Sequence, residues 1–358
     1  MHDKVASQAF SFSCDINDPD SVLPCEKMLG AFDDDNRTLF ADLEIHEKKC
    51  NYDGGLLTCA AVGGVAAKPE HRGKGAVKAL FAHLFRESDY DVSILYPFSE
   101  TYYRKLGYER VGRSVCAVVP FSELSDVQRN HDAVLYEGSD TEQLLSIYNK
   151  CARNYNLSFV RETADAFSIA PYSSGLYTYI RKNDAFATLS VDREKSTVFV
   201  REIGFDSCES MLGIIGFLRN FEGNQTKLCF QKIPERSPLL RCVRDLKNCD
   251  IQLHSTGAAR ILNTEKVLRS HKYPPGHGVF TIQVADEVFR VKYSENGVET
   301  EKNGVYAPDA VMGIHTASEL LLTGFTDETF IPGLVIKNSD SDFFKAFPPK
   351  TTFFSDCF

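Results

Sequence analysis

The sequence predicts a mixed α/β (α+β) protein made of more than one domain. Three observations support this prediction. The chain has 358 residues, which is too long for one typical domain and suggests two or three. Segments in which apolar and polar residues alternate, as in half-buried strands, are interleaved with segments of helical periodicity. An order of strands, helix and strand near the N-terminus also returns in the middle of the chain.

The first predicted domain opens with two strands joined by a turn. Residues 38–48 alternate apolar and polar positions and therefore predict a strand. The segment NYDGG at residues 51–55 predicts a turn. Residues 56–67 predict a second strand, which is expected to break at Gly63-Gly64 and to end before Pro69.

A helix and two short elements follow. From Gly75 onward the apolar residues recur at the spacing of one helix face, namely Val77, Leu80, Phe81, Leu84 and Phe85. Residues 90–98 predict a short strand. Residues 100–112 predict a short helix followed by a turn at Gly107.

The polar segment 124–133 is the best candidate for a first domain boundary. Beyond it, residues 176–205 predict three strands joined by tight turns. A helix near residues 210–220 and a strand at 227–233 repeat the order of the first domain. Between strand and helix, however, this second domain has the acidic segment GFDSCES at residues 204–210. An acidic turn is a poor phosphate cradle, so we expect this domain to be structural.

A third domain is predicted to begin near Cys249. Residues 258–270 predict a helix, residues 278–302 predict strands rich in hairpins, and residues 309–324 predict an amphipathic helix that ends at a glycine. The sequence therefore predicts domains at residues 1–128, 129–248 and 249–358.

The composition narrows the possible function classes. A net charge of −9 and a pI near 5.6 disfavour a general nucleic-acid binder. Eleven cysteines without a CxxC pair argue against a disulfide framework and a zinc site, and favour reduced thiols. No apolar run reaches the ~20 residues of a membrane-spanning helix, and the N-terminal segment lacks the apolar core of a secretion signal. We expect a cytoplasmic protein without a metal and without nucleic-acid or membrane partners.

The turn Arg72-Gly73-Lys74-Gly75 lies between a predicted strand and a predicted helix. At such a junction, successive backbone N–H groups can converge on an anion, helped by the positive end of the helix dipole. Glycines let the backbone come close to the anion. The turn is neither a P-loop nor a GxGxxG fingerprint. On the pattern alone, a solvated basic turn that caps the helix stays an alternative.

The segment VAAKPEHRGKGAVKAL resembles motif A of the GNAT acetyltransferase superfamily, in which an [RQ]xxGx[GA] turn holds the pyrophosphate of acetyl-CoA. Val77 departs from the pattern because a small residue is usual there. A bulky apolar residue at this position is typical of the enhanced intracellular survival (Eis) branch, which SILYPFSETYYRKLGYERVG also resembles. The resemblance covers the whole chain. It implies two GNAT-type mixed-sheet domains in tandem, the second without a cofactor site, followed by a sterol-carrier-protein-like α+β domain.

The resemblance also implies a site for acetyl-CoA as the acetyl donor. The main chain of one strand is expected to bind the pantetheine arm, and the turn that follows is expected to hold the pyrophosphate. The strand residues are Val65, Ala66 and Ala67, and the turn residues are Arg72, Gly73, Lys74, Gly75, Ala76 and Val77.

Two further residues are implied as catalytic. Tyr103 aligns with the tyrosine that serves the family as general acid, while Tyr102 and Tyr108 are neighbours expected to pack. Eis-like enzymes use their own C-terminal carboxylate as base, which here belongs to Phe358. The preceding tail is rich in phenylalanine, which suggests that it is anchored; the alternative is that the terminus frays. Neither His71 nor His83 stands out as a base.

The expected acceptor is a primary amine on an aminoglycoside, a polyamine-like small molecule or a lysine. Acidic residues suit a cationic acceptor, and the candidates are Asp33, Asp34, Asp35 and Asp356, although charge runs usually form solvated faces. Two alternatives stay open: a lipid-binding protein that acts through the third domain, and a CoA sensor without turnover. A homo-oligomer also stays open, because motifs do not define interfaces.

Overall fold

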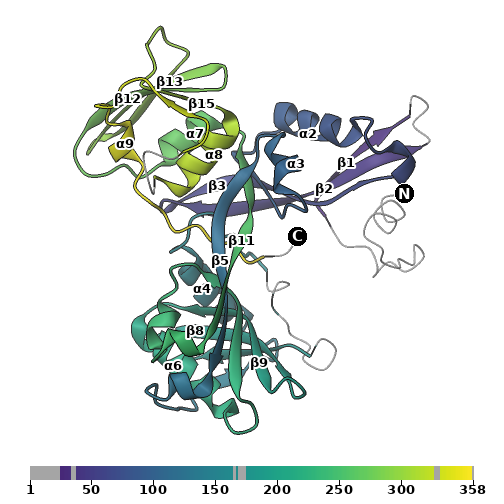
Figure 1. Ribbon diagram of the computed structural model, residues 1–358, viewed down its shortest axis with the longest axis vertical. Helices are drawn as coiled ribbons and strands as arrows, with labels where there is room; N and C mark the ends of the chain where they lie inside the picture. The colour runs from purple at the N-terminus through teal and green to yellow at the C-terminus, as the bar shows by residue number, and fades with distance from the viewer. Residues whose placement is uncertain (1–24, 34–37, 164–166, 168–174, 326–330, 357–358) are drawn as a thin grey trace. The chain divides into compact units, whose positions relative to one another are not determined.

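The computed structural model describes residues 25–33, 38–163, 167, 175–325 and 331–356 (Figure 1). Within these residues the strands form two mixed sheets, one of eleven strands and one of five, and this confirms the predicted α+β class. The chain divides into two compact units. Unit 1 is made of the described residues of Met1–Val111 and Gly257–Pro349, and unit 2 of those of Gly112–Thr256 and Lys350–Cys357. The division into three domains stays a prediction.

Unit 1 contains a mixed sheet with its helices, followed by a second, smaller sheet. Its elements are β1 (Lys27–Phe32), β2 (Leu39–Tyr52), β3 (Gly55–Ala67), the 3₁₀ helix η2 (Pro69–His71), α2 (Ala76–Glu87), β4 (Val92–Leu95), α3 (Glu100–Arg104), α7 (Thr264–Ser270), β12 (Gly278–Val284), β13 (Glu287–Ser294), β14 (Gly297–Lys302), β15 (Ala310–Met312), α8 (Ile314–Thr323), β16 (Leu334–Ile336) and α9 (Phe343–Ala346). Two long strands, β5 (Glu109–Pro120) and β11 (Asp250–Ile261), have residues in both units. In the described residues no helix is long and apolar enough to cross a membrane.

The first sheet of unit 1 has the strand order β1-β2-β3-β4-β11. Its predicted hairpin is confirmed: β2 and β3 pair antiparallel, joined by Asp53 and Gly54 with φ of +50° and +86°. An Asp-Gly pair with positive φ at both positions makes the two-residue turn that matches strand twist. The helix predicted from Gly75 is also confirmed as α2, which packs its apolar face, including Leu80, Phe81 and Leu84, onto this sheet.

The prediction of a helix at residues 258–270 is wrong in its first part. Ala258–Ile261 belongs to β11 and pairs antiparallel with β4, so that Ala258 lies opposite Leu95. The helix begins only at Thr264, where the side chain of Asn263 accepts a hydrogen bond from the amide of Lys266. Alanine favours helices, but here pairing with a distant strand overrides that local preference.

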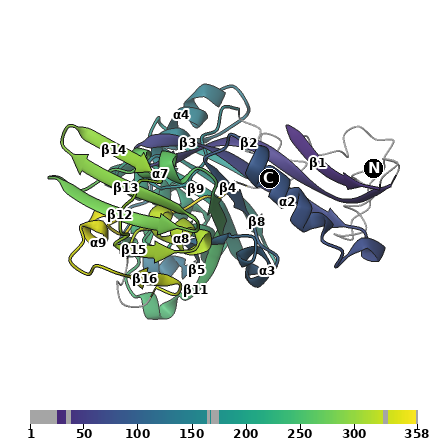
Figure 2. The ribbon, with the colours of Figure 1, turned by 90° about the horizontal axis from the view of Figure 1, so that it is seen from above.

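The second sheet of unit 1 has the strand order β14-β13-β12-β15-β16, and its strands lie side by side in Figure 2. The hairpins predicted at residues 278–302 are confirmed as β12, β13 and β14. The amphipathic helix predicted at residues 309–324 begins later, because Ala310–Met312 forms β15. Phe343 and Phe347 are fully buried against Phe280 of β12.

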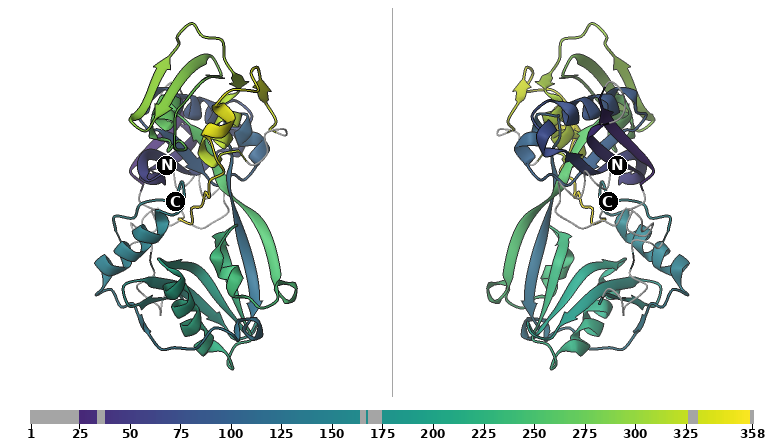
Figure 3. Two further views of the ribbon diagram at one scale, coloured as in Figure 1. Left: turned by 90° about the vertical axis from the view of Figure 1, so that its left-hand side faces the viewer. Right: turned by 90° about the vertical axis from the view of Figure 1, so that its right-hand side faces the viewer.

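Unit 2 is a twisted sheet with a helix on each face (Figure 3). Its elements are β6 (Ala133–Leu135), α4 (Thr141–Ala152), β7 (Tyr177–Arg181), β8 (Ala185–Asp192), β9 (Thr197–Phe205), α6 (Cys208–Leu218) and β10 (Lys227–Pro234), with 3₁₀ turns η3 (Phe121–Leu124), η4 (Arg219–Phe221), η5 (Pro238–Cys242) and η6 (Leu246–Asn248). Neighbouring residues of β8 face opposite sides: Ala185 and Ala187 pack in the core that includes α6, whereas Phe186 packs in the core that includes α4. The order β8-β9-α6-β10 repeats β2-β3-α2-β4, as the sequence predicts, and β9 and β10 are parallel like β3 and β4.

Candidate active site

The strands β3 and β4 separate in the middle of the sheet. They pair in parallel from Cys59 with Val92 to Val62 with Leu95, where β4 ends. β3 continues for five residues, Gly63–Ala67, which remain next to β2 on their other edge. Among the described residues no strand pairs with the edge that β4 leaves. This edge therefore offers backbone N–H and C=O groups to a ligand.

A bulge lies at Gly64, just beyond the last residue of β3 that pairs with β4. The pairing of β2 with β3 shifts between Asp42 and Glu44, which lie opposite Ala66 and Gly63, and this marks a bulge. Gly64 has φ +56°, and a Cβ at this position would lie 2.6 Å from the carboxyl group of Glu44. A β-bulge bends its strand and increases the local twist. The predicted break at the two glycines is therefore wrong: β3 continues through them with a bulge.

The turn after β3 presents the N-terminus of α2 to solvent. Gly73 and Gly75 have φ of +74° and +85°, and no atom lies within 4 Å of the Cβ that either could carry. No side chain caps the helix, and its first bonded amide is that of Ala79, which donates to the carbonyl of Gly75. The amides of residues 73–78 have no acceptor in the described part of the chain. Unsatisfied amides at the positive end of a twelve-residue helix form an anion site.

The charged residues of the turn have different environments. Arg72 folds back, and its Nε donates to the carbonyl of Ala67 at 3.2 Å, which ties the turn to the end of β3. Lys74 is exposed. His71 stacks on Phe40 with ring centroids 4.1 Å apart, and His83 is exposed on α2. Neither histidine is held toward the uncapped amides by a described hydrogen bond.

Tyr103 lies in the hydrophobic core between α2 and α3. Its side chain is 3% exposed, and its ring contacts those of Phe81, Phe98 and Tyr108 edge-on. Burial raises the pKa of its hydroxyl well above the usual value, with a smaller contribution from Tyr102. The hydroxyl has no hydrogen-bond partner in the described ranges. Tyr108, by contrast, hydrogen-bonds the hydroxyl of Ser93 at 2.7 Å, as a packing residue does.

One hydrophobic cluster brings five of the sequence-predicted residues together. Tyr103 is buried in it, and four of the predicted acetyl-CoA residues pack against it, namely Val65, Ala67, Ala76 and Val77. Ala66 faces the opposite side of β3, where it packs against Leu39. The side chain of Ala66 therefore lies away from the cluster, so only its main chain is available for the predicted role.

Sequence reasoning missed Arg260, which supports the segment after Tyr103. This residue of β11 donates from Nη1 to the carbonyl of Leu106 at 2.8 Å, and its guanidinium lies over the ring of Phe85. A Cβ on Gly107, whose φ is +85°, would lie 1.7 Å from the same guanidinium. Gly107 was recognisable from its turn, but Arg260 lay in a segment predicted to be helical.

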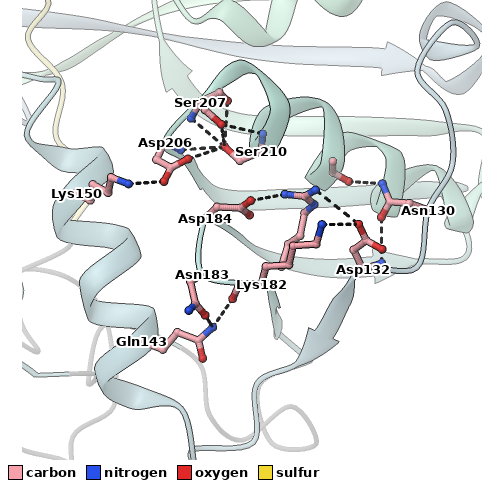
Figure 4. Close-up of polar contacts among 12 residues, drawn as sticks. Asn130, Asp132, Gln143, Lys150, Lys182, Asn183, Asp184, Asp206, Ser207 and Ser210 are labelled. Atoms are coloured by element: carbon pink, nitrogen blue, oxygen red, sulfur yellow. Dashed lines mark hydrogen bonds and ion pairs between the residues drawn. The ribbon is translucent and has the colours of Figure 1, made fainter.

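The helix of unit 2 that corresponds to α2 has a closed N-terminus (Figure 4). The hydroxyl of Ser207 accepts the amide of Ser210, while the hydroxyl of Ser210 accepts the amides of Asp206 and Ser207. The Asp206 carboxylate bonds Lys150 at 2.6 Å beside them. These amides are thus occupied by hydrogen bonds within the protein, unlike those at the start of α2. The absence of a cofactor site in this half stays a prediction.

The remaining predicted residues lie at the ends of the described chain. Phe358, Asp34 and Asp35 fall outside the described residues. Asp33 accepts the amide of Thr38 at 3.0 Å. Asp356 bonds Arg161 and the hydroxyl of Tyr148 in unit 2, so it is engaged by the protein rather than exposed to a cationic acceptor.

Comparisons with known proteins identify a domain family for part of the chain and a fold for all of it. Residues 3–111 match the family model of the acetyltransferase (GNAT) domain, while no curated protein matches the sequence. Similar solved structures include a GCN5-related N-acetyltransferase from Anabaena variabilis (20% identity, 99% of this chain and 96% of that chain, TM-score 0.82) and Eis1 from Mycobacterium abscessus (17%, 100% and 96%, 0.81). A protein of unknown function from Enterococcus faecalis, described as a probable N-acyltransferase, is also similar (16%, 100% and 96%, 0.84). At these identities the likeness shows a shared fold. Residues 3–111 therefore match an acetyltransferase (GNAT) domain, and the chain has an Eis-like fold over its full length.

Proposed function

We propose that the protein transfers the acetyl group of acetyl-CoA to a primary amine of an aminoglycoside, a polyamine-like small molecule or a lysine. One observation carries this proposal: the uncapped N-terminus of α2 directly follows the free edge of β3. The amides of residues 73–78 suit the pyrophosphate, and the edge of Gly63–Ala67 suits the amide groups of the pantetheine arm. Orienting both reactants in this way can lower the barrier by up to roughly 7–11 kcal/mol.

Tyr103 is the proposed general acid. The amine nitrogen attacks the thioester carbonyl carbon, the C–S bond breaks, and the phenol of Tyr103 gives its proton to the departing thiolate. Burial raises the pKa of Tyr103, so the phenol stays protonated across the physiological range. The same shift makes it a weaker acid than a thiol of pKa ~8.5, so the transfer depends on close positioning beside the sulfur.

The proposed base is the C-terminal carboxylate of Phe358. An alkyl ammonium of pKa ~10.4 is neutral in only about one molecule per thousand near pH 7, so a base is needed. A free α-carboxylate has a pKa of ~3.3–3.7 and needs burial or a relaying water to act. The resemblance to Eis-like enzymes suggests this role. It is supported by the residues before the terminus, which are held by hydrogen bonds and ring contacts as far as Asp356.

The experiment that tests the function measures CoA thiol release with a panel of amines, including kanamycin, spermidine and a lysine peptide. Turnover with at least one amine is expected. Extending the C-terminus by two glycines moves the carboxylate and should abolish turnover, while acetyl-CoA binding stays unchanged. Full activity of the extended chain would contradict the proposed base. Acetyl-CoA binding without turnover on any amine would favour a sensor, and uptake of a fluorescent fatty acid without acetyl-CoA binding would favour a lipid carrier.

A further inference from the structure

An open pocket lies along one side of α2 in unit 1. Its volume is about 310 Å³, at the lower end of the range for small-molecule sites. From α2 it is lined by Lys78, Ala82 and Phe85, which follow one another at the spacing of one helix face. Ala82 lies seven residues beyond Gly75, which is about 10 Å along the helix axis. Most of the pocket therefore lies beyond the uncapped amides at the start of α2.

The other lining residues come from the end of α3 and the segment after it, from β11 and from α8. The charged ones among them are Arg104, Lys105 and Arg260, and His315 is a further lining residue. No aspartate or glutamate occurs among the described residues that line the pocket. The chain as a whole carries a net charge of −9, so this concentration of positive charge is a local feature.

Arg260 is half-buried and has few partners. Its guanidinium lies 4.1 Å from the ring centroid of Phe85, and its Nη1 donates to the carbonyl of Leu106 at 2.8 Å. Its Nε is buried and has no hydrogen-bond partner in the described part of the chain, where no carboxylate forms an ion pair with it either. Burial lowers the pKa of Arg260, because the charged guanidinium loses water that no counter-charge replaces.

Two lysines of the pocket are also without a counter-charge. The side chains of Lys78 and Lys105 are exposed, and neither forms an ion pair with a described residue. Arg104 differs, because it donates two hydrogen bonds to the carboxylate of Glu109, at 2.6 and 2.7 Å, which neutralises its charge. Three positive charges without described partners therefore meet at one pocket. Their mutual repulsion is offset when an anion binds between them.

The donors of the pocket suit a phosphate group. A guanidinium presents its N–H groups in a planar fork that matches two phosphate oxygens, and a lysine adds a point charge on a flexible stem. A phosphate monoester carries a charge of about −1.5 to −2 near pH 7, which is more than a carboxylate carries. We propose that this pocket binds a phosphate monoester, with Arg260, Lys78 and Lys105 as its ligands.

Two sources supply such a group. CoA carries a phosphate monoester on its ribose in addition to its pyrophosphate, and with this source the inference rests on the proposed acetyl-CoA site. A separate phosphorylated small molecule is the other source, and the pocket then binds it whether or not CoA is present. The two sources therefore differ in what CoA does to the binding of free phosphate.

The first measurement titrates the protein with inorganic phosphate, followed by phosphorus NMR at constant ionic strength. The variants are made in Gly75→Asp, whose aspartate repels phosphate from the uncapped amides of α2. Lys78→Gln combined with Lys105→Gln should raise the Kd of phosphate about tenfold or more, because two of the three charges are lost. The control combines Lys266→Gln with Lys292→Gln, which removes two exposed charges elsewhere in unit 1, and should change the Kd less than about twofold.

The second measurement compares the binding of CoA and of dephospho-CoA, which lacks the ribose phosphate, with Gly75 unchanged. If the pocket holds the phosphate of CoA, CoA should bind about tenfold or more tightly than dephospho-CoA. The Lys78→Gln/Lys105→Gln variant should abolish this difference, and saturating CoA should displace inorganic phosphate. If the pocket holds a separate phosphate compound, CoA and dephospho-CoA should bind alike, and CoA should leave the Kd of inorganic phosphate unchanged.

The titration decides the inference without any measurement of turnover. No binding of inorganic phosphate, or an equal Kd in the two double variants, would overturn it. All four substituted lysines are exposed, so both variants should fold, and equal melting temperatures check this. Failure of the proposed acetyl transfer is observed in the thiol-release assay instead, and a protein inactive on every amine would leave the phosphate titration unaffected.

Discussion

Gly75 allows a sharp test of the proposed donor site. The residue is exposed, has φ +85°, and has no atom within 4 Å of a Cβ placed there. An aspartate fits in that space and adds a negative charge beside the amides proposed to bind the pyrophosphate. An asparagine has nearly the same size and also tolerates left-handed backbone, but it is neutral. Comparing Gly75→Asp with Gly75→Asn therefore isolates the charge.

The expected effect follows from the exposure of the site. Two unit charges 4 Å apart repel by about 1 kcal/mol in bulk water and by about 4 kcal/mol at the effective dielectric near a protein surface. Solvent screening favours the lower part of this range, whereas a pyrophosphate carries more than one charge. We therefore expect a repulsion of about 1.4–2.8 kcal/mol between the aspartate and the pyrophosphate. This repulsion raises the Kd of acetyl-CoA about 10- to 100-fold in Gly75→Asp relative to Gly75→Asn.

Calorimetric titration with acetyl-CoA measures this difference, and CoA thiol release measures the kinetics. KM for acetyl-CoA should rise with Kd, while kcat at saturation should stay the same. Near 1 M salt the difference should shrink, because the Debye length is then only about 3 Å. Gly54 provides the matched control, since its φ is +86° and it also has open space around it. Gly54→Asp and Gly54→Asn should bind acetyl-CoA alike, and equal Kd values for the two Gly75 variants would refute the reasoning.

Three further predictions concern the neighbouring residues. Tyr103→Phe should lower kcat about 100-fold or more in the thiol-release assay, with Kd for acetyl-CoA unchanged. The kcat of the control Tyr102→Phe should stay within about threefold of the unchanged protein. An unchanged kcat in Tyr103→Phe would exclude Tyr103 as the general acid. Gly107→Ala should lower the free energy of unfolding, measured in urea, by about 2–4 kcal/mol, because the new Cβ clashes with Arg260 and the φ is positive. The control Gly223→Ala has φ +105° but open space around the Cβ, and should lower it by only about 1–2 kcal/mol. Burial raises the pKa values of Tyr52 and Tyr103 above those in the unfolded chain, so their contribution to stability is fully present below about pH 10 and is lost as the pH rises further. Melting temperatures measured against pH check this, and tyrosinate absorbance that appears together with unfolding below about pH 9 would contradict it.

Local signals in the sequence predicted the elements that carry the site. Helical spacing gave α2, and the Asp-Gly turn gave the hairpin before it, because both patterns depend on near neighbours. The strand at Ala258–Ile261 was missed, because its partner β4 lies far away in the sequence and the segment itself favours a helix.

The residues that support the candidate site also could not be predicted from their sequence neighbours. The residues next to Gly64 in the sequence predict a strand break. They give no sign of the contact with Glu44 that accompanies the bulge, because that contact is made across two strands. Arg260 hydrogen-bonds the carbonyl of Leu106, after Tyr103, although the two residues lie far apart in the sequence. The roles of Tyr103 and Phe358 came from resemblance, since neither residue carries a pattern that periodicity or spacing can reveal.

The contrast between α2 and α6 has a consequence for the folding of the protein. α6 completes its own first turn with Ser207 and Ser210, whereas α2 begins at a glycine that offers no side chain. A glycine in place of a capping side chain usually lowers helix stability by a few tenths of a kcal/mol, so the first turn of α2 should fray more readily than that of α6. In the proposed complex, the phosphates of acetyl-CoA would act as the absent cap. Bound acetyl-CoA would then complete the hydrogen bonds of the first turn of α2. Release of CoA after each turnover would leave that turn free to fray before the next acetyl-CoA binds.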